Sequence, residues 1–490
     1  MKPLLSWILV HAGIAATLAA QPFELRFLDA ESGRGIPLVE ARTVNNIAYV
    51  SDSHGRIAFD EPGLLGKRVF FHLQSHGYEM PKDGFGMVGV RVRTRAGGRA
   101  EFRLVRINVA ERLYRITGQG IYAESKRLGL PTPLTEPVLN GEVVGQDSTQ
   151  AVEYKGKIHW FWGDTARASY PLGHFQTAGA VSLPPADGGL NPNSGIDLKY
   201  FVNDEGFSRP MAPMKQGSLV WIDGVCVVPD RSGDETLIAR FSRRKSLAKQ
   251  LEHGLLRYDD DQELLVREST LSPDNKWRHP KGQATIHGRH VYFAAPFATV
   301  RAPATAEGAL NASSYEALAL VTNSVGKTVY QWRKDLAPVD QGSEARRLKT
   351  SPAQQPTPLL QLHDADSGKP VTAHAGSVRW NAHRNRWIMI TVQQHGTSYL
   401  GEVWYAEAPD IIGPWGPAVK IVTHEKYSFY NPVQHEFFDE DGGRFIYFEG
   451  TYTKMFSGND IATPRYDYNQ VMYRLDLDDP RLAKARGNTR

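Results

Sequence analysis

The sequence contains one cysteine in 490 residues, so the chain offers no partner for an internal disulfide. Cys226 lies within the apolar run 225–228, whose side chains do not provide the electropositive, accessible setting that a reactive thiolate needs. We therefore expect Cys226 to be a buried strand residue. The HExxH, paired CxxC, GxSxG and P-loop motifs are also absent, which leaves zinc protease, serine esterase and P-loop functions without local support.

No window beyond the N-terminus approaches the roughly 20 apolar residues that a membrane-spanning helix needs, so we expect no membrane span. Residues 1–20 combine Lys2, an apolar run at 4–18 and small residues before Gln21, a pattern typical of a signal peptide. The chain is therefore predicted to be secreted or periplasmic. The formal net charge is only +4, and the one dense basic cluster, at 240–249, has almost no interleaved aromatic residues. We expect no nucleic-acid partner.

The segment 21–107 alternates short strand-like runs with turns rich in glycine, asparagine and serine. This alternation predicts a small antiparallel β-sandwich. Three stretches within it, 29–37, 51–56 and 69–73, resemble the carboxypeptidase regulatory-like domain of secreted bacterial proteins. The resemblance implies an accessory domain without a catalytic role.

From 143 to 490 one pattern recurs: a strand, a tight polar turn, a second strand, a variable excursion and one or two further strands. The recurrences begin near 143, 217, 281, 374 and 431. Four-stranded blades around an axis fit this pattern and remove the open sheet edges that a long meander would expose. Residues 108–142 form a linker with one displaced strand, 115–122, which we expect to close the ring by pairing in the last blade.

We therefore predict an all-β protein with an N-terminal β-sandwich followed by a five-bladed β-propeller. A pair of Greek-key sandwiches or a right-handed β-helix would fit the strand content too. The β-helix is disfavoured because its coils are shorter and more regular.

The fourth unit carries motifs that resemble a known family. The stretches 376–380, 385–387, 403–409 and 413–415 are similar to those of the five-bladed propeller glycosidases, which include arabinanases, xylosidases and neoagarobiose hydrolases. The resemblance implies a carbohydrate-active protein whose partner is a glycan, bound in the propeller funnel. It requires no cofactor, although some members hold a structural calcium on the axis, and no residue set in this chain is specific enough to name as its ligands.

In a propeller, the heads of the first strands and the loops after the second strands line the mouth of the funnel. Asp147 heads the first strand of the first unit, and Asp164 follows its second strand. Glycoside hydrolysis needs a proton donor and a carboxylate that acts as nucleophile or activates water. The family places a base aspartate at the position of Asp147. An aspartate that caps a tight turn remains the alternative for it.

The sequence departs from the family at the third unit, where many members carry the acid glutamate. This chain has His-Pro-Lys-Gly-Gln at 279–283 and no carboxylate. We therefore nominate Glu449 and His435 as replacement proton donors, because the predicted blades place both at the funnel mouth. An ordinary hydrogen-bonded funnel residue is the alternative for each.

The substrate-binding candidates are the aromatic, amide and basic side chains expected at the same mouth: Trp162, Lys281, Gln283, His374, His395 and Tyr430. Aromatic faces can stack on sugar rings, although tryptophans in strands of this kind are more often blade core. The function predicted is a glycoside hydrolase acting on a polysaccharide or oligosaccharide. A non-catalytic glycan-binding or scaffold propeller is one alternative. A sugar-acid lyase or epimerase that relies on Lys281, His374 and His435 is the other.

Overall fold

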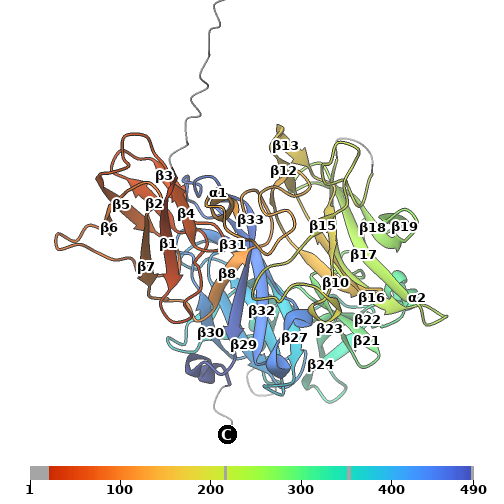
Figure 1. Cartoon of the computed structure of the whole chain (residues 1–490). Helices are drawn as coiled ribbons and strands as arrows, with labels where there is room; N and C mark the ends of the chain where they lie inside the picture. The colour runs from red at the N-terminus through yellow and green to blue at the C-terminus, as the bar shows by residue number, and fades with distance from the viewer. Residues whose placement is uncertain (1–20, 215–217, 350–354, 487–490) are drawn as a thin grey trace, which may run out of the picture.

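The structure is a computed structural model that describes residues 21–214, 218–349 and 355–486, so the predicted signal peptide lies outside the described residues (Figure 1). The described part is nearly all strand. Its α-helices are short: α1 (Ala123–Arg127), α2 (Ala306–Leu310) and α3 (Gln341–Lys349). Within the described ranges, no helix has the length and apolar character needed to cross a bilayer.

The N-terminal part forms two sheets around one core (Figure 1). Alternation of apolar and more exposed residues explains why these segments form half-buried strands. In β5, for example, Val69, Phe71 and Leu73 are buried in that core and the residues between them are more exposed. The first sheet has the order β4-β1-β7, with β1 (Phe23–Asp29), β4 (Arg56–Phe59) and β7 (Arg99–Leu104). The second has the order β3-β2-β5-β6, with β2 (Glu40–Thr43), β3 (Ala48–Val50), β5 (Arg68–Gln74) and β6 (Gly89–Arg93).

Five sheets follow one another through the rest of the described residues, and their first strands contact one another in chain order. The first contains β10 (Gln150–Tyr154), β11 (Lys157–Trp162), β14 (Ala178–Ser182) and β15 (Lys199–Tyr200). The second contains β16 (Leu219–Pro229), β17 (Glu235–Arg244), β18 (Gln250–Asp259) and β19 (Leu264–Thr270). The third contains β20 (Gln283–His287), β21 (His290–Ala294), β22 (Val300–Pro303), β23 (Glu316–Thr322) and β24 (Thr328–Arg333).

The fourth and fifth sheets complete this series. The fourth runs from β27 (Ala373–Asn381) through β28 (Arg386–Gln393), β29 (Val403–Ala408) and β30 (Pro417–Val422) to β25 (Leu362–Asp364) and β26 (Pro370–Val371). The fifth contains β31 (Ser428–Gln434), β32 (Phe445–Thr453), β33 (Asn469–Asp476) and β8 (Glu111–Arg115). A small sheet, β9 (Val143–Gln146), β12 (Thr165–Arg167) and β13 (Tyr170–His174), extends the first one.

A strand from the segment 108–142 pairs in the last sheet, but it is β8 (Glu111–Arg115) and not the expected stretch 115–122. Strand β8 lies antiparallel to β33, with Tyr114 opposite Met472 and Arg115 opposite Val471. Strand β8 ends at Arg115, the residue at which the expected strand 115–122 begins. The reason is local, because Gly118 and Gly120 have φ of 98° and 73°, in the left-handed region that interrupts an extended strand.

Strand β31 also begins earlier than expected. It starts at Ser428, whereas the recurring pattern placed the fifth unit's start near Asn431. The register with β32 shifts between Tyr430 and Val433, and Asn431 within that shift has φ of 50°. This bulge disrupts the alternation that sequence patterns rely on. As a result, Gln434 and His435 lie at the end of the strand opposite to its head.

The N-terminal sheets share an apolar core with the fourth and fifth sheets. Leu38 and Val50 belong to the same apolar cluster as Tyr427, Phe429 and Tyr452 of the fifth sheet and its approach. Glu124 in α1 reinforces this contact, because its buried carboxylate accepts hydrogen bonds from the Ala58 N–H (2.9 Å), Arg127 (3.1 Å) and Arg465 (3.2 Å). One side chain thus joins the N-terminal sheets, α1 and the loop before β33.

We predict that Glu124→Ala lowers the free energy of unfolding by about 1–3 kcal/mol, because it leaves the buried Ala58 N–H without its acceptor and removes the partner of two partly exposed arginines. Thermal melting of the purified protein measures the effect. Glu136→Ala is the matched control, since Glu136 is exposed. Equal melting temperatures for the two variants would show that the contact is not structural.

Candidate active site

The structure brings Asp147 and Asp164 together. Each lies between two strand pairings: Gln150 pairs with Phe161 on one side of the two aspartates, and Gln146 pairs with Thr165 on the other. The backbone N–H of Asp164 donates to the Asp147 carboxylate (2.8 Å), and the N–H of Gly163 donates to the Asp147 carbonyl (2.7 Å). These two hydrogen bonds hold Asp147 and Asp164 next to each other.

The fifth sheet supplies the other side of this site. The hydroxyl of Tyr430 donates to Asp147 (2.9 Å), and the hydroxyl of Tyr468 hydrogen-bonds the same carboxylate. The side-chain amide of Asn431 donates to the Ser148 hydroxyl (2.8 Å). Ser148, Asn431 and Tyr468 have φ of 59°, 50° and 69°, a region that non-glycine residues occupy at a cost of about 1 kcal/mol or more each. Backbone strain thus gathers around Asp147, as it often does at functional sites.

The two carboxyl groups differ in their surroundings. Burial raises the pKa of Asp147, while hydrogen bonds from Tyr430 and from the Asp164 N–H oppose that rise. Burial and, next, the charge of Asp147 raise the pKa of Asp164 to about 6. The indole N–H of Trp221 donates to Asp164 (2.9 Å) and opposes the rise. Because neighbouring carboxylates resist double ionisation, the pair holds one proton in mildly acidic solution.

A third carboxyl group, not expected from the sequence, lies at the head of the second sheet. Asp223 accepts hydrogen bonds from the N–H of Gly282 (2.7 Å) and of Gly224 (3.0 Å), and so ties the second sheet to the third. A register shift between Asp223 and Cys226 turns the strand at this point. The Asp-Gly dipeptide inside an otherwise apolar run was the available sequence signal for this bend.

Lys281, His374 and His395 are exposed. Lys281 lies just before β20 and His374 at the start of β27, and burial together with the charge of Lys281 lowers the pKa of His374. His395, in the loop after β28, has φ of 61° and packs its ring edge-on against Tyr399. These three side chains are accessible to a ligand.

Gln283 and Trp162 have structural surroundings instead. The side-chain amide of Gln283 donates to the Thr149 carbonyl (3.2 Å), which ties the third sheet to the first. Trp162 is 1% exposed, stacks 6.2 Å from Trp160 and lies 5.5 Å from the Tyr200 ring. Its predicted stacking on a sugar ring is therefore wrong for this structure, because its faces are covered by the first sheet's own core.

His435 and Glu449 do not open at the mouth as expected. They hydrogen-bond one another (2.7 Å) and are 1% and 0% exposed. His435 follows the far end of β31, and Glu449 pairs with Val433 in mid-strand. The rings of Trp160 and Phe437 pack on His435 at 5.1 Å each. The expectation that His435 and Glu449 lie at the funnel mouth is therefore wrong. The early start of β31 is the reason, because it moves both residues away from the head of the strand.

No group of three histidine, cysteine, aspartate or glutamate side chains in the described ranges is arranged to hold a metal ion. No family model and no curated protein matches the chain.

Among solved structures, the chain is similar to several glycoside hydrolases. One is an exo-1,5-α-L-arabinanase from a bovine ruminal metagenomic library, with 9% identity, a TM-score of 0.35 and coverage of 68% of this chain and 94% of that one. Another is an α-L-arabinofuranosidase from Fusarium graminearum, with 12% identity, a TM-score of 0.35 and coverage of 75% and 98%. A third is an exo-β-1,3-galactanase from Phanerochaete chrysosporium, with 8% identity, a TM-score of 0.37 and coverage of 75% and 65%. Likeness of this size assigns neither a family nor an activity to this chain.

Gly163 lies against the Asp147 carboxylate, so a methyl group added there would overlap the carboxylate oxygen that accepts the Asp164 N–H. We predict that Gly163→Ala displaces Asp147 and destabilises the fold by about 1–3 kcal/mol. Gly416→Ala is the control, because an added methyl group there meets open space. Melting temperatures compare the two, and a Gly163→Ala variant as stable as the control would contradict the packing described.

Proposed function

We propose that the protein is a secreted glycoside hydrolase built from an N-terminal β-sandwich and a five-bladed β-propeller, with its active site at Asp147 and Asp164. The observation that supports it most directly is the contact between these two acids at the head of the first sheet. Hydrolysis of a glycosidic bond needs one protonated and one ionised carboxyl group, and a coupled pair supplies both. Five consecutive sheets with touching first strands support the propeller, and the sequence at 1–20 supports secretion.

The surroundings suggest which acid has which role. Asp164 is the proposed proton donor, because its pKa is raised to about 6. Asp147 is the proposed base or nucleophile, since the donors around it oppose the rise that burial causes in its pKa, and since its negative charge is one cause of the raised pKa of Asp164. Tyr430 and Tyr468 would orient Asp147, and Trp221 would orient Asp164. The donor role moves from Glu449 and His435 because those two side chains are enclosed. The reaction needs no cofactor.

We expect Asp147→Asn and Asp164→Asn each to lower the hydrolysis rate by roughly a hundredfold or more, because each removes one half of the acid–base pair. β-1,3-Galactan, arabinan and arabinofuranosides are the first substrates to assay, with reducing-sugar release as the measurement. Asp274→Asn is the matched control, since Asp274 is exposed. If either variant hydrolyses the substrate as fast as the parent, Asp147 and Asp164 are not the acid–base pair. Glycan binding without turnover in the parent would leave a non-catalytic binding protein.

The pH dependence provides a separate check. Because the pKa of Asp164 is raised to about 6, the acid is protonated below that pH and loses its proton above it. We therefore expect kcat/KM to fall as the pH rises through about 6, with the alkaline limb missing from Asp164→Asn. An alkaline limb that persists in the variant would assign the proton donor elsewhere.

A further inference from the structure

Residues 219–223 at the start of β16 and 240–244 at the end of β17 pair with one another beside the two aspartates, and we call this surface the wall. Trp221 donates to Asp164, and Asp223 accepts from the Gly282 N–H, so this side of the hairpin faces the site. Cross-strand partners share a face of a sheet. Since Asp223 pairs with Arg240 and Leu219 pairs with Arg244, both arginines lie on the face that carries Trp221. The Arg244 guanidinium is 5.3 Å from the Trp221 ring centroid, which agrees with that placement.

Lys281 adds a third cation at the head of the third sheet. Its ammonium group has no ion pair or hydrogen bond among the described residues, and its side chain is exposed. Arg240 has no carboxylate within ion-pair distance in the same ranges. One guanidinium nitrogen donates to the neutral Gln250 (3.1 Å), and its buried Nε has no partner. The positive charges here are thus not neutralised by contact.

The acids near the wall do not change this balance. Asp223 is the one carboxylate on its face, and one of its oxygens already accepts two backbone N–H groups. Glu252 lies near the end of the hairpin but is bound by Arg243 (2.6 Å) and Arg267 (2.8 Å). Three cations therefore stand against Asp223 on this face, while Asp164 and Asp147 lie beyond the Trp221 indole as the adjoining acid pair.

The histidines beside the wall are neutral. His253 and His279 are 2% and 3% exposed, with ring centroids 5.4 Å apart. Burial and then the charge of Arg240 lower the pKa of His279 to about 3, and Lys281 acts in the same direction. Burial also lowers the pKa of His253, and Arg240 contributes. The field in this part of the site is positive.

We propose that Arg240, Arg244 and Lys281 form a subsite for an anionic substituent, a carboxylate or a sulfate ester, on the glycan held at Asp147 and Asp164. The proposal rests on the proposed function for the location of the glycan. Arginine can bind such an oxyanion with two N–H donors, and Arg240 donates to the described residues through only one of its guanidinium nitrogens. Arg244 already donates to the Ser242 hydroxyl and the Ser246 carbonyl, so it contributes mainly its charge, and Lys281 adds an accessible point charge. An acidic sugar would otherwise be repelled by the aspartates, so the cations would make the site selective for it.

Binding to the full exported chain tests the subsite. Titration calorimetry with trigalacturonate, a sulfated galacto-oligosaccharide and neutral galactotriose separates the two oxyanion sources from the neutral sugar. A KM from initial rates replaces the Kd for any probe that is hydrolysed. We expect at least one anionic probe to bind about tenfold or more tightly than galactotriose, as charge-assisted hydrogen bonds allow, and to weaken as salt is added.

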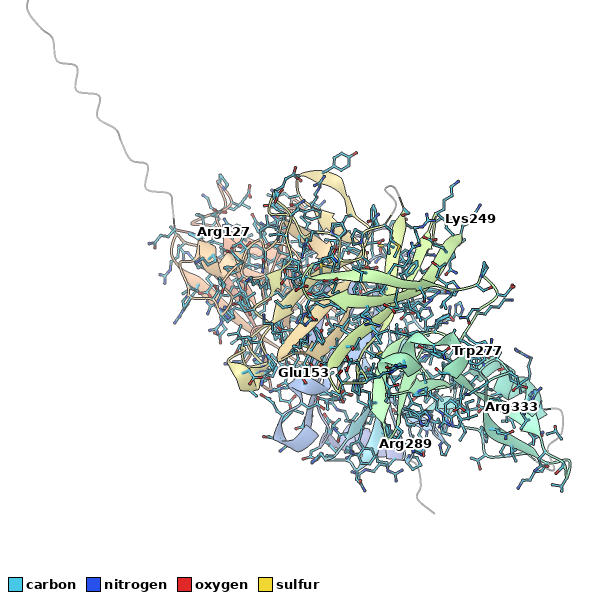
Figure 2. The ribbon with its side chains drawn as sticks, turned by 90° about the vertical axis from the view of Figure 1, so that its right-hand side faces the viewer. Arg127, Glu153, Lys249, Trp277, Arg289 and Arg333 are labelled. Atoms are coloured by element: carbon cyan, nitrogen blue, oxygen red, sulfur yellow. The ribbon has the colours of Figure 1, made fainter. Side chains whose placement is uncertain are left out.

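Variants of Lys281 test whether the proposed subsite causes the preference for anionic probes. Lys281→Gln should weaken the preferred anionic probe about tenfold, whereas Lys281→Arg should retain most of the affinity. Lys327→Gln is the control, because Lys327 is an exposed lysine in the outer β23–β24 turn of the same sheet. A second control is Arg289→Gln, an exposed residue in the β20–β21 turn, at the end of β20 opposite to Lys281 (Figure 2). Both controls should bind like the parent.

Three results overturn the subsite: equal affinity for neutral and anionic probes, no binding of either anionic probe at millimolar concentration, or a Lys281→Gln variant that binds like its controls. Its failure differs from failure of the proposed function. Hydrolysis of neutral glycans alone would remove the subsite and keep the hydrolase. Lys281-dependent binding of an anionic glycan without turnover would keep the subsite and remove the hydrolase.

Discussion

The junction between the first and fifth sheets determines both the fold and the site. A ring of sheets is stable only when its last member meets its first, and here the meeting is polar. Thr149 donates to Glu449 (3.2 Å), the Ser148 N–H donates to the Thr451 hydroxyl (3.0 Å), and Tyr430 donates to Asp147. These buried groups therefore have partners, as burial requires. The pair of Glu449 and His435 belongs to this junction, which explains why two groups with useful chemistry are enclosed.

The same junction positions the acids. Asp147 is one of the residues through which the fifth sheet and the loop before β33 contact the first sheet. Ser148 beside it has a left-handed conformation, and its N–H and hydroxyl are both hydrogen-bonded to the fifth sheet. A rigid neighbourhood of this kind suits a reactive carboxylate, because its orientation is fixed before a ligand arrives. Asp164 depends on a different element, the wall carrying Trp221. Both acids lie at the head of the first sheet, but the side chains that hold them come from parts of the chain that are far apart.

The sequence predicted what local pattern controls. The turn at Lys155 and Gly156 sets the β10–β11 register, and that register is sufficient to bring Asp147 and Asp164 together. It could not predict His435, because the bulge at Asn431 shifts the start of β31, and one asparagine within a strand-like run does not specify such a shift. Tyr468 was missed for another reason. It lies in a loop, and only tertiary contact with Asp147 gives it a role. Trp162 shows the limit of aromatic patterns, which do not distinguish a core face from a binding face.

The charges of the site divide into two halves with Trp221 between them. The largest influence on the pKa of each acid is burial, followed by neutral donors for Asp147 and by the charge of Asp147 for Asp164, and no arginine or lysine is among the causes. Arg240 and Lys281 act instead on Asp223 and on the histidines. The indole ring separates the halves, with its N–H on Asp164 and Arg244 over its face. This separation has a physical consequence. Had the cations lain beside Asp164, they would have held its pKa down and left the pair without a proton to donate. The wall therefore lets positive charge and a protonated acid coexist in one site.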